Sequence, residues 1–91
     1  MQSTDRFNYE NRVWFWDSRP DPHAMGNPRW TTMSDTTSTI IELHVDRYSK
    51  GLTDEEEVVI HPDYVVNVKK CVKICLSDRS IEIPIKRGEP N

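Results

Sequence analysis

The hydrophobic and polar residues of this chain follow two periods, which predict one helix among several strands. Within the segment 35–50, side chains of the expected inner face recur three and four positions apart: Ile40, Ile41, His44, Val45 and Tyr48. This spacing is typical of an amphipathic helix. Ser34 and Asp35 supply an N-cap before the segment, and Gly51 is suited to the left-handed stop after it. The pattern therefore predicts one helix at 35–50.

Short runs of β-branched and aromatic residues predict strands on both sides of this helix. They fall at 13–17 and 29–33 before the helix, and at 58–61 and 64–68 after it. The segment 17–28 between the first two strands contains three prolines and a glycine, so we expect an irregular loop there.

The last part of the chain predicts a β-hairpin from its alternation of apolar and polar residues. Val72, Ile74 and Leu76 alternate with other side chains, and so do Ile81, Ile83 and Ile85. A two-residue turn at Asp78-Arg79 would place Leu76 opposite Ile81, Ile74 opposite Ile83 and Val72 opposite Ile85. All six apolar side chains would then share one face of the sheet.

Together these elements predict an α+β fold. A sheet with one apolar face needs a cover, and a single amphipathic helix can supply it. We therefore expect one helix packed on a curved antiparallel sheet, a half-barrel of about five or six strands. A chain of 91 residues has room for one core. The predicted domain covers 13–87, between a flexible N-terminal segment, 1–12, and a tail, 88–91.

Charge and cysteine content narrow the classes of function. The net charge of −3 provides no general attraction to DNA or to anionic lipid. No apolar run is long enough to span a membrane, and the start lacks the pattern of a secretory signal. In one extended strand, Cys71 and Cys75 would lie ~13 Å apart, too far for a disulfide. Free thiols suggest the cytoplasm or the nucleus.

One metal-binding and one catalytic interpretation are also open. Two histidines and two cysteines could in principle bind zinc: His44, His61, Cys71 and Cys75. Their spacing differs from that of known zinc sites. A cysteine nucleophile would need a base such as His61, yet Val72 and Ile74 beside the thiols favour buried, unreactive cysteines. The acidic run 54–57 is typical of a solvated turn. We therefore expect no enzyme, no metal and no cofactor.

The tryptophans are the most distinctive side chains of the chain. In a strand, Trp14 and Trp16 point to the same face because side chains alternate. Rings of this size either fill a small core or line a pocket, and one ring can do both. The same two interpretations apply to Trp30 and to Tyr64.

The order of these motifs resembles the WWE domain. The resemblance runs from about Val13 to Arg87 and rests on five segments: Trp14-Phe15-Trp16-Asp17, Trp30, Ile41-Glu42, Tyr64-Val65-Val66-Asn67-Val68 and Ile85-Lys86-Arg87. WWE domains are non-catalytic modules of ubiquitin ligases and ADP-ribosyltransferases. Several of them bind poly(ADP-ribose) through its iso-ADP-ribose unit. The resemblance implies the same kind of module here, taking part in ubiquitination or ADP-ribosylation signalling.

The resemblance also implies which residues meet the ligand. Aromatic side chains that sandwich the adenine would be Trp16, Trp30 and Tyr64. Point charges that could partly replace the family's phosphate-binding groups are those of Lys73, Arg79, Lys86 and Arg87. Of these, Lys73 and Arg87 complete the predicted ligand-binding set. Glu42 matches the family's glutamate, which is expected to be structural.

Three positions depart from the family pattern. The family has a strand with the pattern Met-x-Gln, and here Cys71 occupies the position of the methionine and Lys73 that of the glutamine. The family's last strand is basic and carries an arginine two residues before its final Ile-x-Arg. Ile83 occupies the position of that arginine. Arginine can hold a diphosphate with two parallel hydrogen bonds, whereas isoleucine cannot hold it at all. Two hypotheses follow. The chain is either a monomeric module that binds ADP-ribose or poly(ADP-ribose), or a WWE-like scaffold that has lost this ligand and binds a protein partner.

Overall fold

The computed structural model describes residues 13–88 of the chain. In chain order its elements are β1 (Val13–Asp17), β2 (Trp30–Thr32), α1 (Asp35–Ser49), β3 (Glu57–His61), β4 (Tyr64–Asn67), β5 (Val72–Cys75) and β6 (Glu82–Gly88). The predicted flexible segment, 1–12, lies outside the described residues. Gly88, which was predicted to start the tail, is the last residue of β6.

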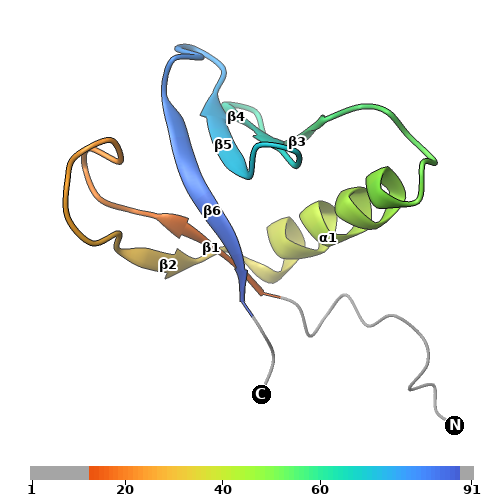
Figure 1. Cartoon of the computed structure of the whole chain (residues 1–91), viewed down its shortest axis with the longest axis horizontal. Helices are drawn as coiled ribbons and strands as arrows, with labels where there is room; N and C mark the ends of the chain where they lie inside the picture. Colours follow the sequence, from red (N-terminus) through yellow and green to blue (C-terminus); the bar gives the residue numbers. More distant parts are fainter. Residues whose placement is uncertain (1–12, 89–91) are drawn as a thin grey trace, which may run out of the picture.

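The six strands form one antiparallel sheet in the order β2-β1-β6-β5-β4-β3. Strand β6 joins the two halves of the sheet, because it pairs with β1 through its end and with β5 through its beginning. The sheet is strongly curved, and α1 lies along its concave side (Figure 1). The predicted α+β architecture, with one helix on a curved antiparallel sheet, is confirmed.

The helix begins and ends for the reasons that the sequence suggests. The Ser34 hydroxyl accepts a hydrogen bond from the backbone N–H of Thr37 at 3.1 Å, which satisfies one of the free donors of the first turn. At the other end, Gly51 has a φ of +75°, a conformation that glycine adopts without strain. The observed helix is one residue shorter than the predicted segment 35–50.

The core lies between α1 and the concave face of the sheet. Its buried residues come from four elements: Trp14, Ile41, Val66 and Ile85. Partly buried side chains pack around them: Trp16, Met33, Val45, Val58, Ile60 and Val68. Trp14 is therefore a core residue, and Trp16 lies at the border of the core.

A fully buried carboxylate links the helix to two neighbouring strands, β1 and β6. Glu42 of α1 accepts a hydrogen bond from the indole Nε1 of Trp14 at 2.9 Å. Arg87 of β6 places its Nε 2.6 Å from Glu42 Oε1 and its Nη2 3.3 Å from Glu42 Oε2. Beside this pair, the hydroxyl of Ser38 accepts from the backbone N–H of Trp14 at 3.1 Å. These polar contacts fix α1 against β1 and β6.

The predicted register of the last hairpin is wrong by one residue. Lys73, not Ile74, lies opposite Ile83, and Ile74 lies opposite Glu82. Partners in register share a face, so Ile74 points away from the concave side that Ile83 occupies. Ile74 is nevertheless only 3% exposed, and Val65 opposite it only 5%. Because both faces of the sheet bury apolar residues here, alternation alone could not select the register.

The turn of this hairpin also differs from the predicted two-residue form. The connection occupies 76–81 and has its own hydrogen bonds, in which the Asp78 carboxylate accepts from the backbone N–H of Ser80 at 3.1 Å. Leu76 and Ile81, which were predicted to pair, are both exposed. Cys71 and Cys75 are free thiols, as predicted.

We predict that Arg87→Ala destabilises the protein much more than its exposure suggests. The substitution leaves the buried Glu42 carboxylate without its cation, and breaking such a pair costs about 3 kcal/mol of the free energy of unfolding. Urea denaturation of the two proteins measures this difference. The control is Arg79→Ala, which breaks the exposed pair with Glu57 and should cost less than about 1 kcal/mol. Equal effects of the two substitutions would contradict the structural role of Arg87.

Candidate functional site

A pocket of about 260 Å³ opens on the concave side of the sheet, near the start of α1. It is bordered by the end of β1, the segment from β2 into α1, the β3–β4 turn and β5. Its lining consists of Trp16, Thr32, Met33, Ser34, Thr37, Ile60, His61, Tyr64 and Lys73. Three of the five predicted ligand-binding residues, Trp16, Tyr64 and Lys73, thus meet in one place.

The strand register explains why these three side chains meet. Trp16 lies opposite Ile85 of β6, and Ile83, two residues earlier, lies opposite Lys73 of β5. Residues in register share a face, and so do residues two apart in one strand. Tyr64 of β4 lies opposite Cys75, two residues after Lys73. All of these side chains therefore project from the same concave face.

The ammonium group of Lys73 lies between two aromatic rings. Its Nζ is 4.0 Å from the ring centroid of Trp16 and 4.4 Å from that of Tyr64. Both distances are within the range of cation–π attraction. Burial lowers the pKa of Lys73, because a half-buried ammonium loses part of its hydration. The rings thus hold a cation that is incompletely solvated, and this cation would respond strongly to an anion brought into the pocket.

Polar groups line the rim of the pocket. The Ser34 hydroxyl donates to the hydroxyl of Thr37 at 3.0 Å, at the first turn of α1. On the opposite side, the ring of His61 lies 6.0 Å from that of Tyr64, and His61 Nδ1 accepts the backbone N–H of Asp63 at 3.1 Å. The pocket therefore combines ring faces and one cation inside with hydroxyl and imidazole groups at its edge.

Trp30 and Arg87, the other two predicted ligand-binding residues, lie elsewhere. Trp30 pairs with Asp17, one residue after Trp16, so its ring projects from the opposite face of the sheet. There, Lys86 Nζ lies 4.8 Å from the centroid of the Trp30 ring. Arg87 is engaged by Glu42. The structure does not bring either side chain into the pocket.

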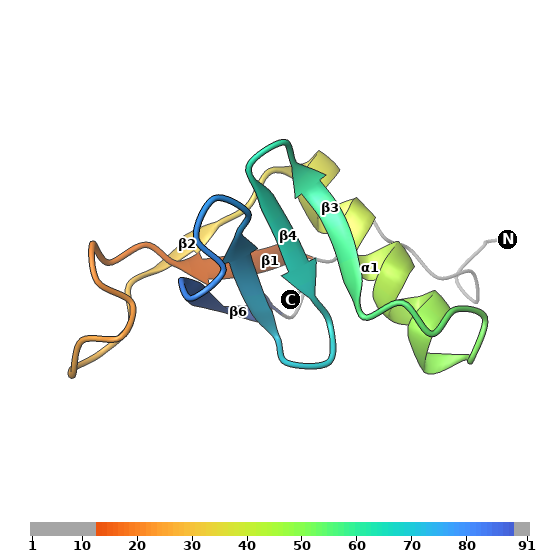
Figure 2. The ribbon, with the colours of Figure 1, turned by 90° about the horizontal axis from the view of Figure 1, so that it is seen from above.

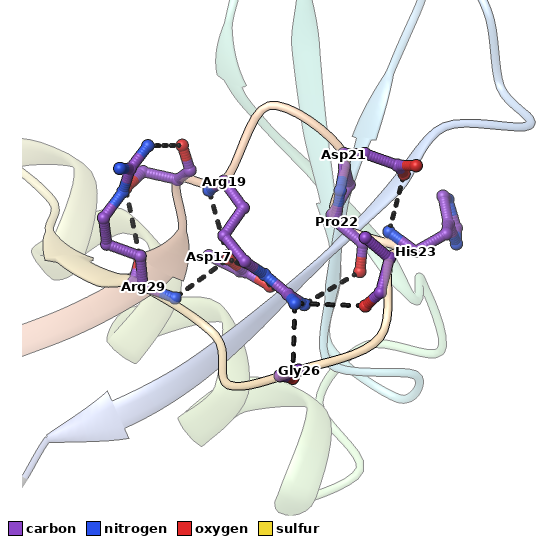
Figure 3. Close-up of polar contacts among 9 residues, drawn as sticks. Asp17, Arg19, Asp21, Pro22, His23, Gly26 and Arg29 are labelled. Atoms are coloured by element: carbon purple, nitrogen blue, oxygen red, sulfur yellow. Dashed lines mark hydrogen bonds and ion pairs between the residues drawn. The ribbon is translucent and has the colours of Figure 1, made fainter.

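The loop between β1 and β2 is held by an arginine that the sequence-based analysis did not identify as important. Arg19 Nη2 lies 2.7 Å from Asp17 Oδ2. The same guanidinium donates to backbone carbonyl groups across the loop, those of Pro22, Ala24 and Gly26 (Figure 3). The loop has no regular structure, as predicted, but its shape is fixed. An aspartate two residues before an arginine, ahead of a proline-rich loop, was the available signal.

The buried Asp17 carboxylate is strongly stabilised by this loop. Its hydrogen bonds from Arg19, and further ones from backbone N–H groups, lower the pKa of Asp17 from 3.8 to about 2. One of those backbone donors is Arg29, at 3.1 Å, just before β2. Asp17 thereby ties both ends of the loop together and fixes the position of β2 beside the pocket.

The other candidates for chemistry were a cysteine nucleophile and a zinc site. Hydrogen bonding with Ser77 lowers the pKa of the Cys75 thiol, and the two side chains lie 3.1 Å apart. Within residues 13–88, no three His, Cys, Asp or Glu side chains gather in a way that could hold a metal ion. The same part of the chain contains no helix long and apolar enough to cross a membrane.

No protein-family model matches the chain, and searches of curated proteins and of solved structures find no significant match.

We predict that Asp17 stabilises the protein in a pH-dependent way. Because the pKa of Asp17 is lower in the folded protein, its contribution is complete above pH 3.8 and disappears as the pH falls towards about 2. The advantage of the wild type over Asp17→Asn in urea denaturation should therefore shrink across this interval. The exposed Asp63 gives the control variant, Asp63→Asn. An Asp17 carboxyl that titrates near pH 4 by NMR would contradict the role of Arg19.

Proposed function

We propose that this chain is a non-catalytic binding module of the WWE type, which takes an ADP-ribose-type ligand between Trp16 and Tyr64. The observation that carries the proposal is the position of Lys73 Nζ, 4.0 and 4.4 Å from the two ring centroids. One small group can contact both rings only if the rings border a common space. That space opens to solvent, and its entrance is lined with polar groups.

The size of the pocket fits one ring system. At about 260 Å³ it is slightly smaller than most sites that enclose a whole small molecule, which begin at roughly 300 Å³. An adenine could stack against Trp16 or Tyr64, while ribose and phosphates extend over the rim. Thr32 and Thr37 offer hydroxyl groups there, and Lys73 offers a cation to the phosphate. Such a module would act in the cytoplasm or nucleus, in ubiquitination or ADP-ribosylation signalling.

Two of the three departures from the WWE pattern, Lys73 and Ile83, fall together in space. Lys73 and Ile83 are cross-strand partners, so the two substituted positions would face the same part of a bound ligand. Ile83 is buried and contributes no hydrogen bond. A single lysine therefore replaces a set of fixed donors. The phosphates that it would attract extend over the open rim, where charges are screened within about 8 Å at physiological salt. The proposal thus includes weak, salt-dependent binding.

A second function, a WWE-like scaffold for a protein partner, is favoured by one specific observation. In the free protein Lys73 occupies the space between the rings, and a planar ligand must displace it. Arg87 is also unavailable, because it neutralises Glu42. If displacing Lys73 costs more free energy than stacking of the ligand contributes, the pocket does not bind nucleotide. The surface of the module then binds a protein instead.

We predict that iso-ADP-ribose quenches or shifts the tryptophan fluorescence of the domain with weak affinity. The affinity should fall steeply with added salt, because Lys73 is the charged side chain in the pocket lining. Tyr64→Ala should weaken binding about tenfold, since stacking on one ring contributes on the order of 1–3 kcal/mol. Trp30→Ala removes a ring from the opposite face and is the matched control. Tight, salt-independent binding would contradict this proposal.

We further predict that Lys73→Gln combined with Ile83→Arg strengthens this binding and reduces its salt dependence. The pair restores the family's hydrogen-bonding groups at two positions that lie opposite each other. Thermal unfolding must accompany the titration, because Ile83 is buried and arginine there is costly. If the folded double variant does not bind iso-ADP-ribose, the scaffold function is favoured instead.

A further inference from the structure

Strand β3 is the last strand of the sheet, so one of its sides has no neighbouring strand. On the inner side, Val68 donates its backbone N–H to the carbonyl of Glu56 at 2.8 Å, and Val58 lies opposite Val66. Hydrogen-bonded and non-bonded pairs alternate in an antiparallel ladder. Glu57 and Val59 therefore direct their N–H and C=O groups outward. This edge therefore leaves four backbone groups without a neighbouring strand.

A groove lies directly beside this edge. It has a volume of about 220 Å³ and is lined by Ile40, Leu43, His44, Arg47, Thr53 and Val58. In Figure 2, α1 runs along the side of β3 that is remote from β4, and Figure 1 shows the helix below the sheet. A strand added to the edge of β3 would therefore lie over the helix and close the groove.

The groove and the edge expose apolar side chains. Leu43 is 42% exposed on the helix, and Val59 is 63% exposed on β3. Val58 points to the helix side and packs on the core, so Val59 points to the other face of the sheet. An added strand would find an apolar contact on each of its two faces.

The groove is held in place at one end, and the strand edge beside it is short. His44 Nε2 and the carbonyl of Glu55 lie 2.8 Å apart, which ties the connection after α1 to the helix. A register shift between Val59 and His61 interrupts the ladder at the other end. Bulges of this kind limit pairing at exposed edges. The usable edge is thus confined to three residues, Glu57 to Val59.

We propose that this edge and groove bind an extended segment of a partner protein, which adds a short antiparallel strand to β3. The partner residue opposite Val59 is apolar and covers it. The next residue, opposite Val58, is apolar and enters the groove against Leu43. The following residues, opposite Glu57 and beyond, are lysine or arginine. From its N-terminus, the recognised sequence is therefore apolar, apolar, basic.

Charge near the start of β3 supports the basic position. Four consecutive acidic residues precede or begin the strand: Asp54, Glu55, Glu56 and Glu57. Glu56 and Glu57 have cationic partners, Lys69 and Arg79. The first two carboxylates, those of Asp54 and Glu55, have no ion-pair partner among the described residues. They are placed to attract a cation at the end of an antiparallel strand.

Selection from a phage-displayed library of random eight-residue peptides tests this proposal. The expected consensus is two apolar residues followed by a basic one. A peptide synthesised from the consensus should perturb the amide signals of Glu57 and Val59 in NMR and slow their hydrogen exchange. Those changes would show pairing with the edge itself.

Two pairs of variants test the two components of the surface. Val59→Pro removes an outward N–H without breaking a β3–β4 bond, and proline is tolerated at such edge positions. It should weaken binding of the consensus peptide at least tenfold, whereas Val59→Thr, which keeps the N–H, should not. Leu43→Lys should also weaken binding at least tenfold. Leu76→Lys, at a similarly exposed leucine outside the groove lining, should have no effect.

Three results would overturn the proposal. The first is a selection without enrichment over a parallel selection on Val59→Pro. The second is a consensus peptide that binds Val59→Pro and Leu43→Lys as tightly as the wild type. The third is sedimentation showing a dimer that Val59→Pro dissociates, because a second copy of this chain would then occupy the edge.

Discussion

Glu42 brings a negative charge into the interior of a small domain, and three elements are organised around it. A buried carboxylate is tolerated only when it is paired and hydrogen-bonded. Trp14 supplies an indole donor from β1, and Arg87 supplies a guanidinium from β6. Because α1 contacts the sheet through these groups, they fix the position and orientation of the helix relative to β1 and β6. The pocket at one end of α1 and the groove along its side both depend on that placement.

Lys73 decides between the two functions proposed for the pocket. Its ammonium gains attraction from two ring faces and loses hydration through burial, and burial lowers its pKa. A ligand that carries an anionic group beside its ring can form an ion pair with Lys73 when the ammonium leaves the two rings. This ion pair offsets the lost cation–π attraction. A neutral aromatic ligand offers no such compensation. The pocket is therefore expected to favour phosphorylated ligands over bare nucleobases or nucleosides.

The pocket and the groove lie on different parts of the molecule and call for different partners. The pocket offers rings and a cation near the start of α1, whereas the groove offers backbone groups and apolar side chains along β3. A nucleotide could occupy the first while a peptide occupies the second. With both sites occupied, the domain would connect an ADP-ribose-type ligand to a second protein.

Local patterns predicted the elements well, because their signals are short-range. The Ser34 cap and Gly51 gave both ends of the helix to within one residue. The register of β5 on β6 could not be predicted, because Ile74 is buried on one face and Ile83 on the other.

The candidate site was only partly predictable for a similar reason. Trp16 and Tyr64 were identified through the resemblance to the WWE pattern, but the face on which Trp30 projects depends on its pairing with Asp17. The role of Arg87 depends on Glu42, which is 45 residues away in the sequence. The contacts of Arg19 depend on carbonyl groups whose positions only the folded loop defines.

The most direct test of the ligand site is an NMR measurement of the Lys73 side chain with and without iso-ADP-ribose. In the free protein, its ε-methylene protons should be shifted upfield by the ring currents of Trp16 and Tyr64. Saturating ligand should reverse this shift and produce nuclear Overhauser effects between the adenine and these two rings. Lys73 signals that do not change at saturation, or Overhauser effects to Trp30 instead, would contradict the assignment of the pocket.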